Sequence, residues 1–157
     1  MSEFHLKDSI GYQINRTAHQ LKSELLKGFS AKGIDVTPEQ WQILTQLWEE
    51  DGVNQKQLSQ VTFKDTGNIS RILDVLQKKG YIFKRRDEID RRNFRIYLTD
   101  EGSALKEPMT TVANDILKFA HMDITQEEID LLIRLLNKIY ENLLLEGDSS
   151  HSPKETK

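Results

Sequence analysis

Two groups of polar side chains in the middle of the sequence are suited to bind DNA. The first group lies at the start of a predicted helix and consists of Thr66, Gly67, Asn68, Ser70 and Arg71. In the major groove, asparagine pairs with adenine and arginine with guanine, and free N–H groups at a helix N-terminus bind phosphate. A solvated amphipathic helix would present the same polar face, so this group alone leaves DNA contact and simple solvation as equal alternatives.

The second group is a basic cluster between two predicted strands. It comprises Arg85, Arg86, Arg91, Arg92 and Arg95. Their mutual repulsion favours an anionic partner, although the interleaved Asp87, Glu88 and Asp90 would also suit a salt-bridged loop. A narrow charged loop beside a recognition helix can enter the minor groove, whose negative potential attracts arginine. Helix and loop together predict DNA binding, and the expected phosphate contacts are Lys84, Arg85, Arg86 and Arg91.

The charge of the chain is distributed unevenly. The formal net charge at pH 7 is −3 over 157 residues. Residues 64–95 contain ten basic and five acidic side chains, a net charge of +5, whereas the rest of the chain contains 12 basic and 20 acidic ones, a net charge of −8. Binding to a polyanion depends on the field at the contact surface rather than on the total. The sequence therefore predicts a basic contact face on an acidic body.

Capping patterns locate the helices before the recognition helix. Thr37 with Gln40, and Asn54 with Gln57, have the spacing of capping boxes and predict two helix starts. The second of these helices is short and would turn Val61 inward. A tight turn then leads to the helix that carries the first polar group, so the two helices form a helix-turn-helix pattern.

The recognition helix and the hairpin after it also have clear limits in the sequence. Asp65 or Thr66 would cap the helix, and Gly80 would end it. Residues 81–84 and 94–98 read as short strands, the second with strict alternation of apolar and polar side chains. The basic cluster is therefore expected on a β-hairpin with a long charged tip.

Long apolar stripes mark both ends of the chain. Residues 6–29 place apolar side chains on one helical face, and Gly28 and Gly33 are expected to break that helix. Pro108 should kink a later helix. A capping box at Thr125 opens the most hydrophobic helix of the chain, whose stripe is wider than packing against one core requires. We therefore expect both ends to take part in dimerisation, with ordinary core packing as the alternative.

Several functional classes find little support. The chain has no cysteine, and its four histidines lack the spacing of metal ligands. Neither a phosphate loop nor a nucleophile motif is present, so we expect no enzyme activity, no cofactor and no metal. No apolar run approaches the roughly 20 residues of a membrane span, and no export signal is evident. These features predict a cytoplasmic protein without membrane contact.

The run from Ile69 to Gly102 resembles the MarR family of transcriptional regulators. The matching residues are Ser70, Arg71, Leu73, Asp74, Leu76, Lys79, Gly80, Tyr81, Ile82, Asp90, Arg91, Arg92, Leu98, Thr99 and Gly102. The order of predicted elements also matches over nearly the whole chain. The resemblance implies a mainly α fold with a small β-hairpin wing, which is a winged helix-turn-helix in an intertwined homodimer with interlocked terminal helices.

The resemblance also implies roles for individual residues. Ser70 and Arg71 fall on the DNA-reading helix. Asp90 and Arg92 fall on the Asp-x-Arg motif of the wing, where the arginine is the minor-groove residue. Asp65 matches a position that in some members pairs with that arginine. Because cysteine is absent, the peroxide-sensing branch of the family is not indicated.

Members of this family often bind small aromatic or phenolic acids. By that resemblance, Tyr12, Arg16, His19 and Trp41 are candidate effector residues, with Arg16 suited to a carboxylate and the rings suited to stacking. The alternative is that these side chains simply lie at an interface or on the surface.

The expected organisation has three parts. Residues 36–109 form the DNA-binding domain, residues 1–35 and 110–146 form the dimerisation lobe, and residues 147–157 are disordered. The predicted function is sequence-specific binding of double-stranded DNA at a pseudo-palindromic operator by a homodimeric repressor, released by a small aromatic ligand. The alternative is a winged-helix protein-interaction module whose basic wing binds an acidic partner.

Overall fold

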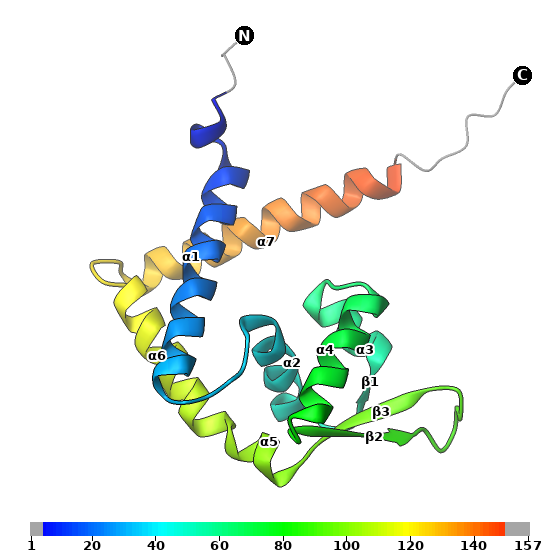
Figure 1. Ribbon diagram of the computed structural model, residues 1–157. Helices are drawn as coiled ribbons and strands as arrows, with labels where there is room; N and C mark the ends of the chain where they lie inside the picture. The colour runs from blue at the N-terminus through cyan, green and yellow to red at the C-terminus, as the bar shows by residue number, and fades with distance from the viewer. Residues whose placement is uncertain (1–4, 150–157) are drawn as a thin grey trace, which may run out of the picture. The chain divides into compact units, whose positions relative to one another are not determined.

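The computed structural model describes residues 5–149, which form helices and one small antiparallel sheet (Figure 1). The elements are η1 (Leu6–Asp8), α1 (Ile10–Ala31), α2 (Pro38–Glu49), β1 (Val53–Asn54), α3 (Gln55–Thr62), α4 (Thr66–Lys78), β2 (Ile82–Arg86), β3 (Phe94–Leu98), α5 (Asp100–Ala104), α6 (Lys106–Ala120) and α7 (Gln126–Ser149). The chain divides into two compact units, residues 1–116 and 117–157. The mainly α fold with a β-hairpin wing is confirmed.

The capping patterns are confirmed by hydrogen bonds. The Thr37 hydroxyl accepts from the backbone N–H of Gln40, whose side chain accepts in return from the backbone N–H of Thr37, both at 3.2 Å. Asn54 and Gln57 form the same reciprocal pair at 2.8 and 2.9 Å. Thr125 begins α7 in the same way. These local signals therefore set the starts of α2, α3 and α7.

The sheet has three strands in the order β1-β3-β2, all antiparallel. The hairpin of β2 and β3 was expected, but β2 begins at Ile82 and extends to Arg86. The two-residue strand β1 was not expected. It pairs Val53 with Ile96 on β3 and so joins the start of α3 to the wing. Ile82 and Ile96 are buried on the sheet face that packs against the helices.

The first unit contains the hydrophobic core. Its buried members are Phe29, Val36, Ile43, Leu44, Leu47, Val53, Leu58, Ile69, Leu73, Leu76, Ile82, Ile96, Met109 and Val112. In α3, the expected inward position of Val61 is wrong, because Val61 is exposed and Thr62 is buried instead. The Thr62 hydroxyl donates to the carbonyl of Leu58 at 2.6 Å, which satisfies its polarity inside the core.

Two expectations about helix breaks need correction. Gly28 does not break α1, which continues to Ala31; a Cβ at Gly28 would lie 2.5 Å from Cγ1 of Val112, so glycine allows α1 and α6 to approach closely. The predicted kink at Pro108 is a full interruption at Leu105, between α5 and α6. Proline has no N–H to donate to the carbonyl four residues earlier, which explains a break at that distance.

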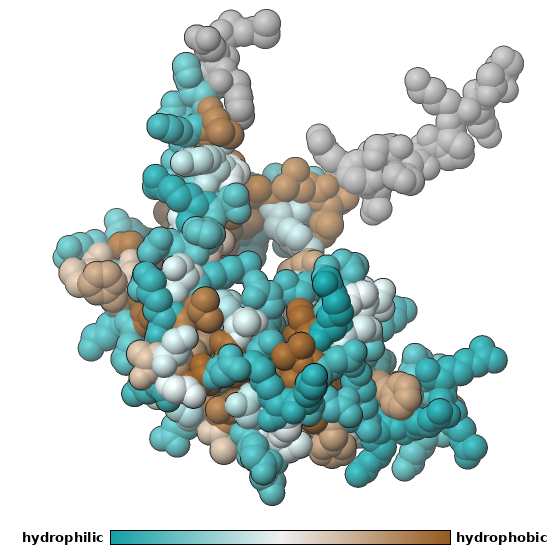
Figure 2. All heavy atoms as spheres, viewed as in Figure 1, coloured by the Kyte–Doolittle hydropathy of each residue, from teal (hydrophilic) through white to brown (hydrophobic). Residues whose placement is uncertain are grey.

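The second unit consists mainly of α7, which carries many exposed apolar side chains. Apolar surface, brown in Figure 2, is visible along part of α7. The exposed apolar side chains of this helix include Leu131, Leu132, Ile133, Leu135, Leu143, Leu144 and Leu145. The helix extends to Ser149, so residues 147–149 of the expected disordered tail are helical, and residues 150–157 lie outside the described residues. No helix in the described range is long and apolar enough to span a bilayer.

Candidate nucleic-acid interface

The leading end of α4 carries a chain of polar contacts. Asp65 caps the helix, accepting from the backbone N–H of Asn68 at 2.9 Å and from its side-chain amide at 2.6 Å. The Arg71 guanidinium in turn donates to the Asn68 side-chain oxygen. The bond from the Asn68 backbone is the main cause that holds the pKa of Asp65 below its ordinary value. Three of the expected DNA-binding residues are therefore connected before any DNA is bound.

Several contacts hold the turn between α3 and α4. Phe63 adopts a left-handed backbone conformation, with φ of 54°, at the end of α3. The Ser59 hydroxyl donates to the carbonyl of Lys64 across the turn. The Gln55 amide donates to the carbonyl of Thr66 at 3.1 Å and to the hydroxyl of Ser70 at 2.5 Å. Gln55 was not expected to take part in the site, and it links the first residue of α3 to the exposed face of α4.

The tip of the wing, residues 87–93, is organised around Asp87. Its carboxylate is only 8% exposed and accepts from the backbone N–H groups of Ile89 and Asp90 at 2.8 and 3.1 Å. It also accepts from Nε of Arg95 at 2.6 Å. The bonds from Ile89 and Asp90, followed by that from Arg95, hold the pKa of Asp87 below its ordinary value. The side chain of Asp87 therefore shapes the turn that presents the following arginines.

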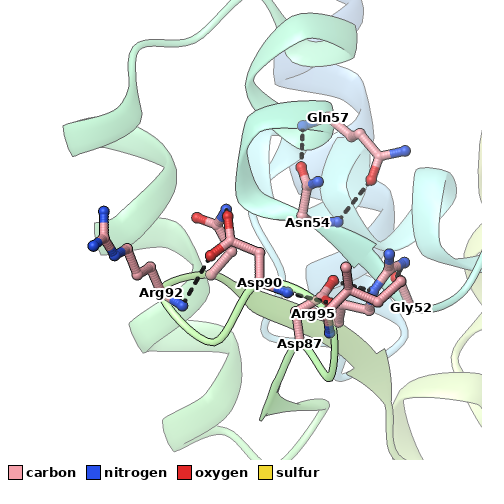
Figure 3. A network of polar contacts seen from close by, with 9 residues as sticks. Gly52, Asn54, Gln57, Asp87, Asp90, Arg92 and Arg95 are labelled. Atoms are coloured by element: carbon pink, nitrogen blue, oxygen red, sulfur yellow. Dashed lines mark hydrogen bonds and ion pairs between the residues drawn. The ribbon is translucent and has the colours of Figure 1, made fainter.

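Arg95 connects the wing to the rest of the sheet. Besides Asp87, its guanidinium donates to the carbonyl of Gly52 at 2.9 Å, just before β1 (Figure 3). The ion pair of Asp87 with Arg95 is one salt bridge of the kind that the alternative interpretation of this loop predicted. Asp87 was not among the expected site residues, and Arg95 was expected only as a member of the basic cluster. An aspartate at the start of a polar loop often accepts from backbone N–H groups that follow it, which is called an Asx turn. The position of Asp87 in the loop is therefore a sequence signal that could have indicated its role.

Asp90 and Arg92 are joined by a hydrogen bond to the backbone rather than by an ion pair. Asp90 accepts from the backbone N–H of Arg92 at 3.2 Å and from the side-chain amide of Asn93 at 2.8 Å. Figure 3 shows the guanidinium of Arg92 pointing away from Asp90. Within residues 5–149 this guanidinium has no hydrogen bond or ion pair. Asp65, which the family pattern pairs with it, is occupied by Asn68.

The other basic side chains of the wing are held in different ways. Lys84 forms an ion pair with Asp74 of α4 at 2.7 Å and is largely covered. The guanidinium of Arg85 lies over the stacked rings of Phe83 and Tyr97, 5.7 and 5.5 Å from their centroids. Arg86 lies 5.7 Å from the centroid of Phe94, and Arg91 is exposed. Aromatic faces hold Arg85 and Arg86 without neutralising their charge.

The four candidate effector residues do not form one site within the chain. Arg16 lies 6.0 Å from the ring of Tyr12, and His19 is exposed on the same helix. Trp41 packs against Phe29, with ring centroids 5.9 Å apart. Seventeen residues separate Tyr12 from Phe29, which is about 25 Å along an α-helix. The indole N–H of Trp41 is buried and has no partner among the described residues.

Metal binding finds no site in the part of the chain that the structure describes. Residues 5–149 contain no group of three His, Asp or Glu side chains that could hold a metal ion.

Comparisons with known proteins agree with this geometry. Residues 34–93 match the profile of the MarR family. The transcriptional regulator SarZ of Staphylococcus saprophyticus is 32% identical over 116 residues, covering 73% of this chain and 79% of its own length. A MarR regulator from Methanosarcina mazei has the same fold, with a TM-score of 0.76 and 28% identity over 86% of this chain and 96% of its own. CouR from Rhodococcus jostii, solved with p-coumaroyl-CoA, shares the fold at 20% identity, with a TM-score of 0.75 over 87% of this chain and 95% of its own. The chain therefore belongs to the MarR family of DNA-binding transcriptional regulators.

Proposed function

We propose that the chain is a repressor that binds a pseudo-palindromic operator as a homodimer. The observation that carries the proposal is the guanidinium of Arg92, which has no hydrogen bond or ion pair within residues 5–149 and lies at the wing tip, in the same unit as the polar end of α4. A helix in the major groove and an arginine in the minor groove would together read one half-site. Two copies related by a twofold axis would bind half-sites about one helical turn, roughly 10 bp, apart.

The exposed apolar surface of the terminal helices supports the homodimer. In α7, Leu143 and Leu145 are 66% and 69% exposed, and in the N-terminal segment Leu6 and Ile10 are 61% and 57% exposed. Large contiguous apolar surfaces on a single chain usually mark an interface. A second copy of the chain carries the same surfaces and would cover them reciprocally.

The proposed division by function differs from the division by contacts. We assign residues 36–109 to DNA binding, and residues 1–35 and 110–146 to dimerisation. The end of α1 and the first turns of α6 nevertheless contribute Phe29 and Val112 to the core of the DNA-binding part. This shared packing would couple the dimer interface to the placement of α4.

The wing residues divide into proposed roles according to their contacts. Arg92 is the proposed minor-groove residue, and Asp90 would orient it through the backbone. The exposed guanidinium groups of Arg85, Arg86 and Arg91 would contact phosphates. Lys84 would have to leave Asp74 to do so, which makes it the weakest phosphate contact of the set.

We further propose that a small aromatic effector releases the operator; the aromatic acyl group of the ligand bound to CouR is the analogy. The indole N–H of Trp41, which has no partner among the described residues, would donate to such a ligand, and Trp41 lines a recess of about 160 Å³ between α2 and α3. Arg16, next to Tyr12, and the exposed His19 offer polar groups for a carboxylate at a second place on α1. A panel of hydroxybenzoates tests this proposal: one of them should release operator DNA from the wild type and lose that effect in Trp41→Phe or Arg16→Ala.

A titration with DNA tests the central proposal. The full chain is mixed with its own upstream promoter duplex and with a random duplex of equal length, at several salt concentrations. We expect preference for the promoter, a steep salt dependence and reduced transcription in a purified system when the promoter is occupied. Equal binding to both duplexes would contradict operator recognition, and increased transcription would contradict repression.

A further inference from the structure

We infer that contacts within the fold leave Ser70 and Arg71 with hydrogen-bond donors to spare at the leading end of α4, so that these two side chains select bases that offer acceptors, guanine above all. The inference rests on the proposed insertion of α4 into the major groove and names what Ser70 and Arg71 read there. It follows from the contact of Gln55 with Ser70 and from that of Asn68 with Arg71.

The contact with Gln55 determines whether the Ser70 hydroxyl donates or accepts there. The Gln55 amide nitrogen lies 3.1 Å from the carbonyl oxygen of Thr66, which can only accept. That contact fixes the amide orientation, because the flipped amide would place two oxygens against each other. The same nitrogen lies 2.5 Å from the Ser70 hydroxyl, which must therefore accept. The hydroxyl hydrogen of Ser70 is left to donate to a base.

The direction of Arg71 is set by Asn68 and Asp65. Because Asp65 accepts from the side-chain nitrogen of Asn68, the amide oxygen must face Arg71, which donates to it. Both polar atoms of the Asn68 side chain are thus engaged by Asp65 and Arg71. Asn68 is therefore a positioning residue that aims Arg71. A guanidinium has five N–H groups, so Arg71 keeps donors for a base.

This set of donors matches only some base edges. Guanine offers two acceptors in the major groove, N7 and O6, which suit a guanidinium. The Ser70 hydroxyl suits a purine N7 or a thymine O4. Cytosine offers an amino group at the same place, so donors would face donors and leave both sides unpaired. The operator half-site should therefore contain a guanine opposite Arg71 and a base with an acceptor opposite Ser70.

The experiment begins with selection of binding sites from a randomised duplex library by the full wild-type chain. We expect one guanine in each half-site whose replacement by any other base weakens binding about 5- to 150-fold. Replacing it by 7-deazaguanine, which lacks the N7 acceptor, should weaken binding by a smaller factor. The variant Arg71→Ala should bind duplexes with any of the four bases at this position equally well, and it should keep the wild-type preferences at the other positions.

Two variants test the positioning residues. Asn68→Ala should reduce the preference for that guanine, and Gln77→Ala, at the far end of α4, is its matched control and should keep that preference. Gln55→Glu replaces the amide donor beside Ser70 by an acceptor, so the Ser70 hydroxyl would donate to it and turn its lone pairs toward the groove; the base preference should then shift toward adenine or cytosine. Because the new carboxylate also lies near the carbonyl of Thr66, the unfolding temperature of this variant is measured beside its base preference. The added charge affects all sequences alike and cancels in the ratio.

The outcomes separate this inference from the proposed function. If a selected operator requires Arg92 but contains no guanine that depends on Arg71, the inferred selection of guanine by Arg71 is wrong, whereas the proposed operator binding stands. Unchanged base preferences in both Asn68→Ala and Gln55→Glu would also overturn it. If the selection enriches no sequence, the proposed function itself fails.

Discussion

Five arginines lie close together in the wing, but they are held in different ways. Arg95 is bonded to Asp87 and to the carbonyl of Gly52, so it stabilises the sheet. Aromatic rings support Arg85 and Arg86, whereas the guanidinium of Arg92 has no partner within the described residues. A charge that folding leaves unpaired is the one most available to a ligand, which makes Arg92 the residue to test first.

Arg92→Ala should weaken operator binding and lower the slope of log affinity against log salt by about 1, because one cationic contact is lost. The free energy of unfolding should change by less than about 0.5 kcal/mol, since no contact within the fold is removed. Fluorescence anisotropy at several salt concentrations measures the first effect and urea unfolding the second. Arg134→Ala, in α7, is the matched control. Loss of the dimer in Arg92→Ala would show that the wing is misassigned.

The order of the wing tip should depend on pH through Asp87. Its lowered pKa means that the folded state favours the carboxylate, so the stabilisation is complete above about pH 4, the ordinary value for aspartate. It is lost as the pH falls through the lowered pKa. Amide exchange at Ile89 should therefore be slow and constant from pH 5 to 8 after correction for intrinsic rates, and should lose protection in acid. In Asp87→Asn the protection should be reduced at every pH; unchanged protection would contradict this role.

At the level of elements, Gly28 sets the distance between α1 and α6. Alanine usually stabilises a helix relative to glycine, but a Cβ here would meet the stiff side chain of Val112 at 2.5 Å. Gly28→Ala should therefore destabilise the fold by about 1–3 kcal/mol in urea unfolding. Adding Val112→Ala should recover part of that loss, giving a favourable coupling energy in a double-mutant cycle. Gly11→Ala, on the same helix with open space around it, is the control and should be neutral or stabilising.

The elements that sequence predicted well are those encoded by local chemistry. Capping at Thr37, Asn54 and Thr125 depends on residues three apart, and the left-handed conformation of Gly80 ends α4 as expected. The strand β1 was missed because two residues carry no periodicity and its partner lies more than 40 residues away. The role of Gly28 was missed for the same reason, since only the fold brings Val112 beside it.

The candidate site shows the same division. Residue types placed the polar end of α4 and the basic wing on the correct elements, and Asp65, one of the two expected caps, is the observed helix cap. The sequence alone could not show which side chains form hydrogen bonds with partners on other elements. The contacts of Gln55 with Ser70 and of Arg95 with Gly52 join separate elements, so they become visible only when the fold is known.

At the level of the whole molecule, the exposed face of α7 would determine whether two DNA-binding units act together. Leu132 and Leu143 are eleven residues apart, about three helical turns, and therefore lie on the same face. Both are more than half exposed in the single chain. Covering such a face with a second copy would hold two recognition helices at a fixed distance, which the terminal helices rather than the wing would set.

Introducing charge on this face should separate the two copies. We expect Leu132→Glu with Leu143→Glu to be monomeric in sedimentation equilibrium, because each glutamate would have to be buried without a partner. Operator affinity should fall about 100- to 10,000-fold, since the second half-site is no longer bound intramolecularly, while affinity for an isolated half-site stays the same. Asn137→Glu adds the same kind of charge on another face of α7 and should remain dimeric. Truncation after Ile124 should likewise abolish the dimer, and a variant or fragment that stays dimeric would place the interface elsewhere on the chain.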